Sequence, residues 1–348
     1  MRIPIPLPNP SPITDLLRMK KTLFLALAFP LWLSAQSDPV VDSLQKIIAQ
    51  KQAALDPAGE ASALFELGKL YYNRQQDQPA RESTEKALAI LPPGNPVLKG
   101  RLLYRKAMLI YFSGQNFPQV LSLFDSAGVL LKPSGDPVIL GPFFQSYGSI
   151  LNQQLKHQEG QKILLEAEQM FLKNKGPATT DPLLNVYSNL LAGSYALGDY
   201  QAALTFARKG IETGKNSSNY ELIADLYYNN ALTLSALKYG KDSEQSYLKS
   251  LDYARKGNAT ASIISACMAL GDYYFHLSQP RPGFQYLAEA QTAATGTQDF
   301  YSLATIRKIE AVWYTSQKDY VKAMTAIDSC IAYFEKTQGP RQQQGIFY

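Results

Sequence analysis

The chain contains 348 residues, 46% of them hydrophobic and 18% charged, and this composition excludes an intrinsically disordered chain. The formal net charge is +5, and most of the surplus comes from basic residues near the N-terminus. Because no basic run or stripe follows, the sequence gives no sign of a nucleic-acid partner.

Residues 1–18 contain five prolines in their first twelve positions, which opposes a packed helix or strand. We interpret them as an upstream extension that is not native, with Met19 as the natural start. Residues 19–35 are typical of a signal peptide, because Lys20 and Lys21 precede the short apolar run "TLFLALAFPLWLSA". The sequence therefore predicts an exported protein of the periplasm or cell envelope.

Residues 36–59 are expected to form an N-terminal capping helix. The stretch "DPVVDSLQKIIAQKQAALD" at 38–56 is amphipathic, so one face of a helix here would cover the edge of whatever packs next to it. No later segment is long and apolar enough for a membrane helix, and we expect no membrane span in the mature chain.

An internal repeat dominates the rest of the chain. The position of Gly68 recurs at 68, 108, 148, 191, 231, 271 and 311, with spacings of 40 residues and a single spacing of 43. A period held over seven copies is typical of a solenoid and argues against a globular domain with a central site.

Each copy reads as two helices. Tyr104, Ala107, Met108 and Tyr111 lie three or four residues apart, which places them on one helical face. Segments rich in glycine, proline and asparagine separate the copies, the last of them being "TQGP" at 337–340. The sequence therefore predicts antiparallel helix pairs.

Small residues recur where the two helices of a pair would cross. We expect them to permit a close approach of the helix axes, so that a larger side chain would force the pair apart. The small residues on the first helix, Gly68, Gly148, Gly271 and Ala311, are predicted to meet Ala80, Gly160, Ala203, Gly283 and Ala323 on the second.

The pattern resembles the tetratricopeptide repeat, whose signature runs W-x2-L-G-x2-Y, then A-x3-F, then A and P. The first copy carries Leu67, Gly68 and Tyr71, and the sixth carries "LGDYY" at 270–274. Two features depart from the family: the period is 40 residues instead of about 34, and tryptophan is absent from the signature position. The resemblance implies an all-α fold, a right-handed α-solenoid of about seven helix pairs over residues 60–343.

The sequence offers little support for a catalytic site or a metal site. His157 and His276 stand alone, without a neighbouring cluster of metal ligands. Cys267 and Cys330 fall on helix-packing positions, where we expect them to be small buried hydrophobic residues. The sequence contains no nucleophile elbow and no phosphate-binding loop, so we predict no enzyme, no cofactor and no metal site.

The functional prediction is a concave groove that binds a protein or peptide, as the resemblance implies. Exposed tyrosines suit peptide recognition, although the alternative is that they pack between neighbouring repeats. The groove positions of the family correspond here to Lys69, Tyr72, Arg105, Phe112, Gln145, Asn152, Tyr195, Tyr228, Ser235, Asp272 and Lys308.

The last residues suggest an unfinished array. Residues 344–348 place Phe347 where the register expects an eighth aromatic residue, so we expect a truncated eighth repeat and an uncapped edge that permits self-association. Together with the export signal, this arrangement resembles the extracytoplasmic part of sensor histidine kinases or regulators from Bacteroidetes-type bacteria. The alternative is a free-standing periplasmic scaffold for envelope assembly or glycan capture.

Overall fold

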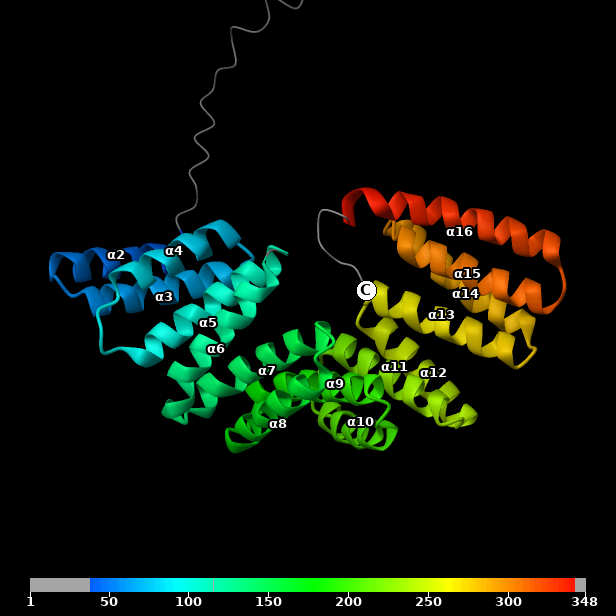
Figure 1. Ribbon diagram of the computed structural model, residues 1–348, viewed down its shortest axis with the longest axis horizontal. Coiled ribbons are helices and arrows are strands. Elements are labelled where there is room, and N and C mark those ends of the chain that lie inside the picture. Colours follow the sequence, from blue (N-terminus) through cyan, green and yellow to red (C-terminus); the bar gives the residue numbers. More distant parts are fainter. Residues whose placement is uncertain (1–37, 115, 342–348) are drawn as a thin grey trace, which may run out of the picture.

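The computed structural model describes residues 38–114 and 116–341. The sequence predictions for residues 1–18, 19–35 and 344–348 lie outside them. Within the described residues the chain is helical without a strand, and the helices follow an open arc from α2–α4 through α7–α10 to α15–α16 (Figure 1).

Seven helix pairs, called units one to seven here, follow one another along this arc, as the sequence predicted. The first helices of the units are α3 (Pro57–Asn73), α5 (Pro96–Phe112), α7 (Pro137–Gln153), α9 (Thr180–Ala196), α11 (Tyr220–Ala236), α13 (Thr260–His276) and α15 (Phe300–Ser316). The second helices are α4 (Asp77–Ile90), α6 (Phe117–Leu131), α8 (His157–Lys173), α10 (Tyr200–Gly214), α12 (Gly240–Lys256), α14 (Pro280–Gly296) and α16 (Tyr320–Arg341). In the middle of the arc α7 and α9 lie on its inner side and α8 and α10 on its outer side (Figure 1).

The period of 40 residues has a simple origin in the later units. The helices α11, α12, α13 and α14 each contain 17 residues, and turns of three residues separate them. Two such helices and two such turns make one period. The one spacing of 43 residues coincides with the longer connection between α8 and α9, which contains the short helix η3 (Pro177–Thr179).

The turns share one hydrogen-bonded geometry. Between α11 and α12 the Lys238 amide donates to the Ser235 carbonyl, and the Tyr239 amide donates to the Leu234 carbonyl, both at 2.9 Å. This is a Schellman motif, in which the middle residue adopts the left-handed backbone conformation. The residues at the corresponding position of the other three-residue turns also have positive φ angles, namely Leu55, Gln75, Leu155, Gly198, Asn258, Ser278, Gln298 and Lys318.

Replacing Leu155 by glycine is expected to raise the free energy of unfolding by about 0.5–1 kcal/mol. Leu155 has a φ of 59° and is 69% exposed, so its side chain gains little burial. A left-handed backbone costs an L-residue about 1–2 kcal/mol, and the greater freedom of unfolded glycine offsets part of the gain. Leu197→Gly is the matched control in the next unit, because Leu197 has a φ of −78°. Urea denaturation should show the two variants shifting in opposite directions.

Close approach between the helices of a pair is confirmed. A Cβ atom added to Gly148 would lie 3.0 Å from the Gly160 carbonyl oxygen and 2.6 Å from Leu164 Cγ. The same contact recurs three units later, where a Cβ atom on Gly271 would lie 3.3 Å from the Gly283 carbonyl oxygen. No side chain fits between these helices without moving them apart.

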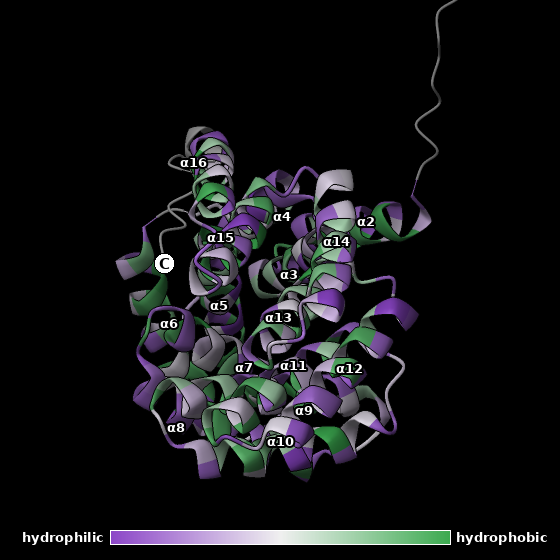
Figure 2. Ribbon diagram, turned by 90° about the vertical axis from the view of Figure 1, so that its right-hand side faces the viewer, coloured by the Kyte–Doolittle hydropathy of each residue, from purple (hydrophilic) through white to green (hydrophobic). Residues whose placement is uncertain are grey.

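The core in units two and three is aromatic. The Phe124 ring is fully buried and stacks on the Tyr147 ring, with 4.9 Å between centroids and 13° between planes. The rings of Phe143 and Tyr104 lie 5.8 and 5.6 Å from Phe124. Figure 2 shows hydrophobic and hydrophilic residues on the same helices, as expected for helices that each bury one face.

Helix α2 (Pro39–Ala53) precedes the first unit and packs against α3. Asp38 caps its N-terminus, because its carboxylate accepts hydrogen bonds from the Val40 and Val41 amides at 3.0 and 3.3 Å. Ile48 is its buried residue. The helix thus places an apolar face on the edge of unit one and a polar face outward.

The C-terminal helix differs from the sequence prediction. Helix α16 contains 22 residues and continues through Gly339 and Pro340 to Arg341, where "TQGP" had predicted a break. In the internal units, the first helix of the next unit packs against the second helix of the pair and limits where that helix ends. The described residues contain no helix after α16. Its outer face consequently leaves large apolar side chains exposed, namely Tyr320, Val321 and Met324.

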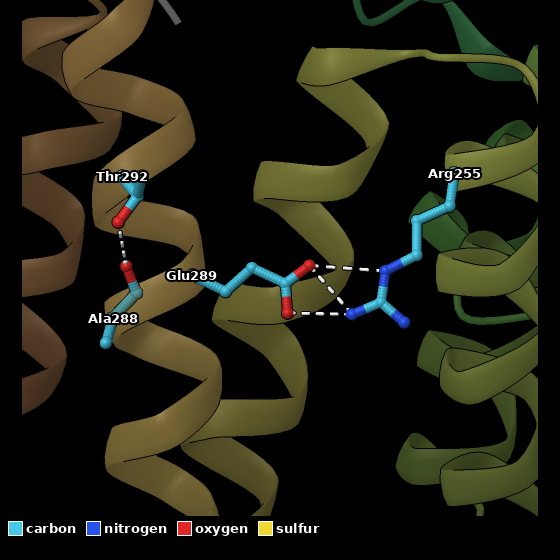
Figure 3. Close-up of polar contacts among 4 residues, drawn as sticks. All are labelled: Arg255, Ala288, Glu289 and Thr292. Carbon is cyan, nitrogen blue, oxygen red and sulfur yellow. Dashed lines mark hydrogen bonds and ion pairs between the residues drawn. The ribbon is translucent and has the colours of Figure 1, made fainter.

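Ion pairs also connect neighbouring units. Arg255 on α12 binds Glu289 on α14 in a bidentate manner, with two nitrogen–oxygen distances of 2.8 Å and one of 3.2 Å (Figure 3). The hydrogen bonds to Glu289 raise the pKa of the Arg255 guanidinium. Cys267 lies on α13, the helix between α12 and α14 in the chain. Burial raises the pKa of its thiol to about 12, so this cysteine is a packed, neutral residue as predicted.

Candidate functional site

Four of the predicted groove residues come together in one pocket. Tyr228, Ser235, Asp272 and Lys308 lie on α11, α13 and α15 and line a pocket of about 470 Å³. We call it the polar pocket. Its other lining residues are Leu232, Tyr247, Met268, Ala269, Tyr273, His276, Thr305, Ile309 and Val312.

The first helices of units five, six and seven supply most of the residues that line this pocket. Ser235 and Asp272 come from the last two turns of α11 and α13, and Lys308 from the middle of α15. Aliphatic walls from Leu232 and Ile309 separate the polar groups. The pocket thus combines hydrogen-bonding groups with apolar surface, which is typical of ligand sites.

Tyr247 is a pocket residue that the sequence analysis did not assign to the groove. It comes from the second helix α12, is 5% exposed, and meets the Tyr228 ring at 5.9 Å in an edge-to-face contact. No hydrogen bond within the described residues reaches its hydroxyl. Burial first, and then the neighbouring Tyr228, Tyr195 and Asp272, raise the pKa of Tyr247.

The Asp272 carboxylate has one basic neighbour within its own helix. His276 Nε2 lies 3.5 Å from Asp272 Oδ2, and both side chains are substantially exposed. The adjacent Tyr273 is engaged elsewhere, since its hydroxyl donates to the Gly240 carbonyl at 3.0 Å. Asp272 therefore faces the pocket with its hydrogen-bonding capacity largely unused.

A second, apolar pocket adjoins the first. It measures about 320 Å³ and shares Lys308 and Val312 with the polar pocket. We call it the apolar pocket, and its remaining lining residues are Ala311, Thr315, Ile327, Cys330 and Ile331. Cys330 corrects the sequence prediction, because it is only half-buried: the outer helix α16 has no following helix within the described residues to cover it.

The N-terminal end of the predicted groove is basic and aromatic. The Arg105 guanidinium carbon lies 5.0 Å from the centroid of the Phe65 ring and 5.1 Å from that of Tyr72, and Phe112 lies 6.2 Å from Tyr72. Burial lowers the pKa of Arg105 and raises that of Tyr72 to about 12. Lys69 is exposed and lies 3.8 Å from Glu66. These contacts hold Arg105 of unit two against the Phe65 and Tyr72 rings of unit one.

Gln145 and Asn152 are bound to the neighbouring unit. Gln145 donates to Asn185 Oδ1 at 3.0 Å, and Asn152 donates to the Asn189 carbonyl at 2.9 Å. A Cβ atom on Gly160 would lie 2.5 Å from Asn152 Oδ1. These two groove positions therefore connect units three and four. Tyr195, the remaining predicted residue, is half-buried and meets the Tyr200 ring at 5.6 Å.

The described residues contain no group of three or more His, Cys, Asp or Glu side chains that could hold a metal ion. His157 begins α8, and its Nδ1 is buried without a hydrogen-bond partner. Over residues 38–114 and 116–341, no helix combines the length and the apolar character that crossing a membrane requires.

No protein-family model matches the chain. No curated protein matches it either. Among solved structures, the chain is similar to aspartyl phosphate phosphatase F from Bacillus subtilis, with 14% identity, a TM-score of 0.58, and coverage of 89% of this chain and 95% of that one.

Two further structures have the same architecture. A STAND signal-transduction ATPase with a tetratricopeptide repeat sensor, from Pyrococcus horikoshii, gives 12% identity and a TM-score of 0.57, covering 84% of this chain and 47% of that one. The Rap conjugation regulator of plasmid pLS20, in complex with the Phr* peptide, gives 15% identity and a TM-score of 0.50, covering 86% and 80%. At these identities the likeness concerns the fold, which is an all-α solenoid similar to tetratricopeptide repeat proteins.

Proposed function

We propose that this solenoid is a non-catalytic module that binds a peptide or an extended protein segment in the polar pocket and along the neighbouring inner surface. The polar pocket carries the proposal, because it brings four groove positions together with the buried Tyr247. A regulator with a similar fold is named as a peptide complex, which supports the same kind of ligand here.

We further propose that the module is the extracytoplasmic sensing part of a signal-transduction protein. Two observations support this proposal: the apolar run after Lys20 and Lys21 is typical of an export signal, and one solenoid of similar fold is a sensor within a signal-transduction ATPase. The exposed outer face of α16 is the surface we propose for self-association.

A randomised peptide library displayed on phage and selected on the immobilised protein tests the proposed function. We expect enriched peptides, and we expect Ala269→Trp to weaken their binding by about tenfold or more, because the indole would fill the pocket that Ala269 lines. Ala288→Trp is the matched control, since Ala288 is exposed on the second helix α14. Light scattering beforehand establishes whether the protein is a monomer or self-associates.

Two results would contradict the proposed function. One is a selection in which no peptide is enriched over the bare support. The other is equal binding of the enriched peptides to the Ala269→Trp and Ala288→Trp variants, which would place their site outside the polar pocket.

A further inference from the structure

The polar and apolar pockets adjoin each other and differ in character. Lys308 and Val312 line both of them, and we call the two pockets together the groove. On one side of this pair lie Tyr228, Tyr247 and Asp272, and on the other side the lining is almost entirely aliphatic. A ligand that fills the groove must therefore be polar at one end and apolar at the other.

The polar end offers a hydrogen-bonding group to a ligand. Tyr247 is 5% exposed, it lines the pocket, and no hydrogen bond within the described residues reaches its hydroxyl. The hydroxyl oxygen is not one of the buried atoms without a partner, so it is accessible from the pocket. A ligand group that bonds to this hydroxyl would take the place of solvent.

The charge that suits this end is positive. The rings of Tyr228 and Tyr247 meet edge to face at 5.9 Å, and aromatic faces attract cations. Asp272 supplies a carboxylate in the same pocket, where His276 lies 3.5 Å away and is itself largely exposed. Besides burial, Asp272 also raises the pKa of Tyr247, which agrees with this sign because a nearby carboxylate opposes a further negative charge.

The junction residue Lys308 suits the main chain of a ligand. It has an exposed side chain with no ion pair among the described residues, and a lysine ammonium donates readily to a carbonyl oxygen. Beyond it, Ile327 and Ile331 of α16 present partly exposed aliphatic surface that favours an apolar side chain.

We propose that the peptide bound by this groove carries a basic side chain, which enters the polar pocket between Tyr228, Tyr247 and Asp272, and an aliphatic side chain, which occupies the apolar pocket beside Ile327 and Ile331. This inference rests on the proposed peptide-binding function and adds the chemical class of the ligand. An acidic side chain in the polar pocket would meet the Asp272 carboxylate, whereas the lysine of that pocket, Lys308, lies at the junction with the apolar pocket.

Synthetic fluorescent peptides with a common glycine–serine frame test the inference by titration of the full chain. The reference peptide contains one arginine and, a few positions away, two leucines. In a second peptide glutamate replaces the arginine, and in a third serine replaces both leucines. We expect the reference peptide to bind more tightly than either analogue by about tenfold or more.

Protein variants assign the two contacts. Asp272→Asn and Tyr247→Phe should each weaken the reference peptide by about fivefold or more and reduce the preference for arginine over glutamate. Their matched controls are Asp252→Asn and Tyr253→Phe on α12, outside the pocket lining, and these should leave binding unchanged. Ile331→Ser should weaken the reference peptide but not the serine analogue.

Each other outcome overturns the inference in a recognisable way. Equal or tighter binding of the glutamate peptide excludes a cation site, and an arginine preference that survives both Asp272→Asn and Tyr247→Phe places the cation elsewhere. If none of the three peptides binds up to about 1 mM, the inferred ligand class is wrong. Peptides enriched in the phage selection would in that case still support the proposed function.

Discussion

Replacing Phe124 by alanine is expected to lower the free energy of unfolding by about 3–5 kcal/mol, the usual cost of removing a fully buried ring from a core. Phe124 has no exposed surface, and the rings of Tyr104, Phe143 and Tyr147 lie within 5.8 Å of its centroid. The cavity would remove one ring contact from each of the three. Urea denaturation followed by circular dichroism measures the loss.

Phe112→Ala provides the control for this prediction, because Phe112 is a phenylalanine of unit two that is 60% exposed. Its replacement should change the free energy of unfolding by about 0.5 kcal/mol or less. Since each unit contacts only its neighbours, amide hydrogen exchange in the Phe124→Ala variant should accelerate in α5–α8 and not in α13–α15. Equal losses in the two variants would contradict the aromatic core.

Replacing Ala203 by leucine is expected to lower the free energy of unfolding by about 1–3 kcal/mol through overpacking. Ala203 is completely buried on α10, which packs along α9. The leucine side chain has no free volume to occupy, so α9 and α10 would have to separate. The same reasoning applies to Ala323→Leu on α16, where Ala323 is 3% exposed.

Gln201→Leu is the matched control for Ala203→Leu, because Gln201 is exposed on the same helix, two residues earlier. It should leave the thermal midpoint nearly unchanged, while Ala203→Leu lowers it. A midpoint unaffected by Ala203→Leu would show that α9 and α10 do not approach as closely as the structure has them.

The repeat was accessible from the sequence because close packing limits the residue types at a few positions. Only small residues fit where Gly148 faces Gly160 and where Gly271 faces Gly283. The spacing of such positions along the chain therefore indicates where each helix pair lies. The fold class follows from that spacing, and the structure confirms it. In contrast, composition did not reveal turns inside pairs such as α7–α8 and α11–α12, because Leu155 and Lys238 adopt the left-handed conformation there without being glycine.

The candidate site was harder to predict, because exposure depends on contacts between units. Asn152 occupies a groove position yet donates to the Asn189 carbonyl of the next unit. Tyr247 was not assigned to the groove, yet it lines the polar pocket from the second helix α12. Neither outcome can be derived from the spacing of one helix alone.

The uniform turns between α11 and α15 have a consequence for how such an array can change its length. Each period begins and ends at the same Schellman geometry, so gain or loss of one complete period leaves every remaining helix in register. The groove would change, because Tyr228, Tyr247 and Asp272 at its polar end lie on α11–α13, whereas its apolar end is lined by α15 and α16. Duplication of one period between these two ends would preserve the architecture but separate the two halves of the ligand site. Recombination that leaves the fold intact would therefore alter which ligands the protein recognises.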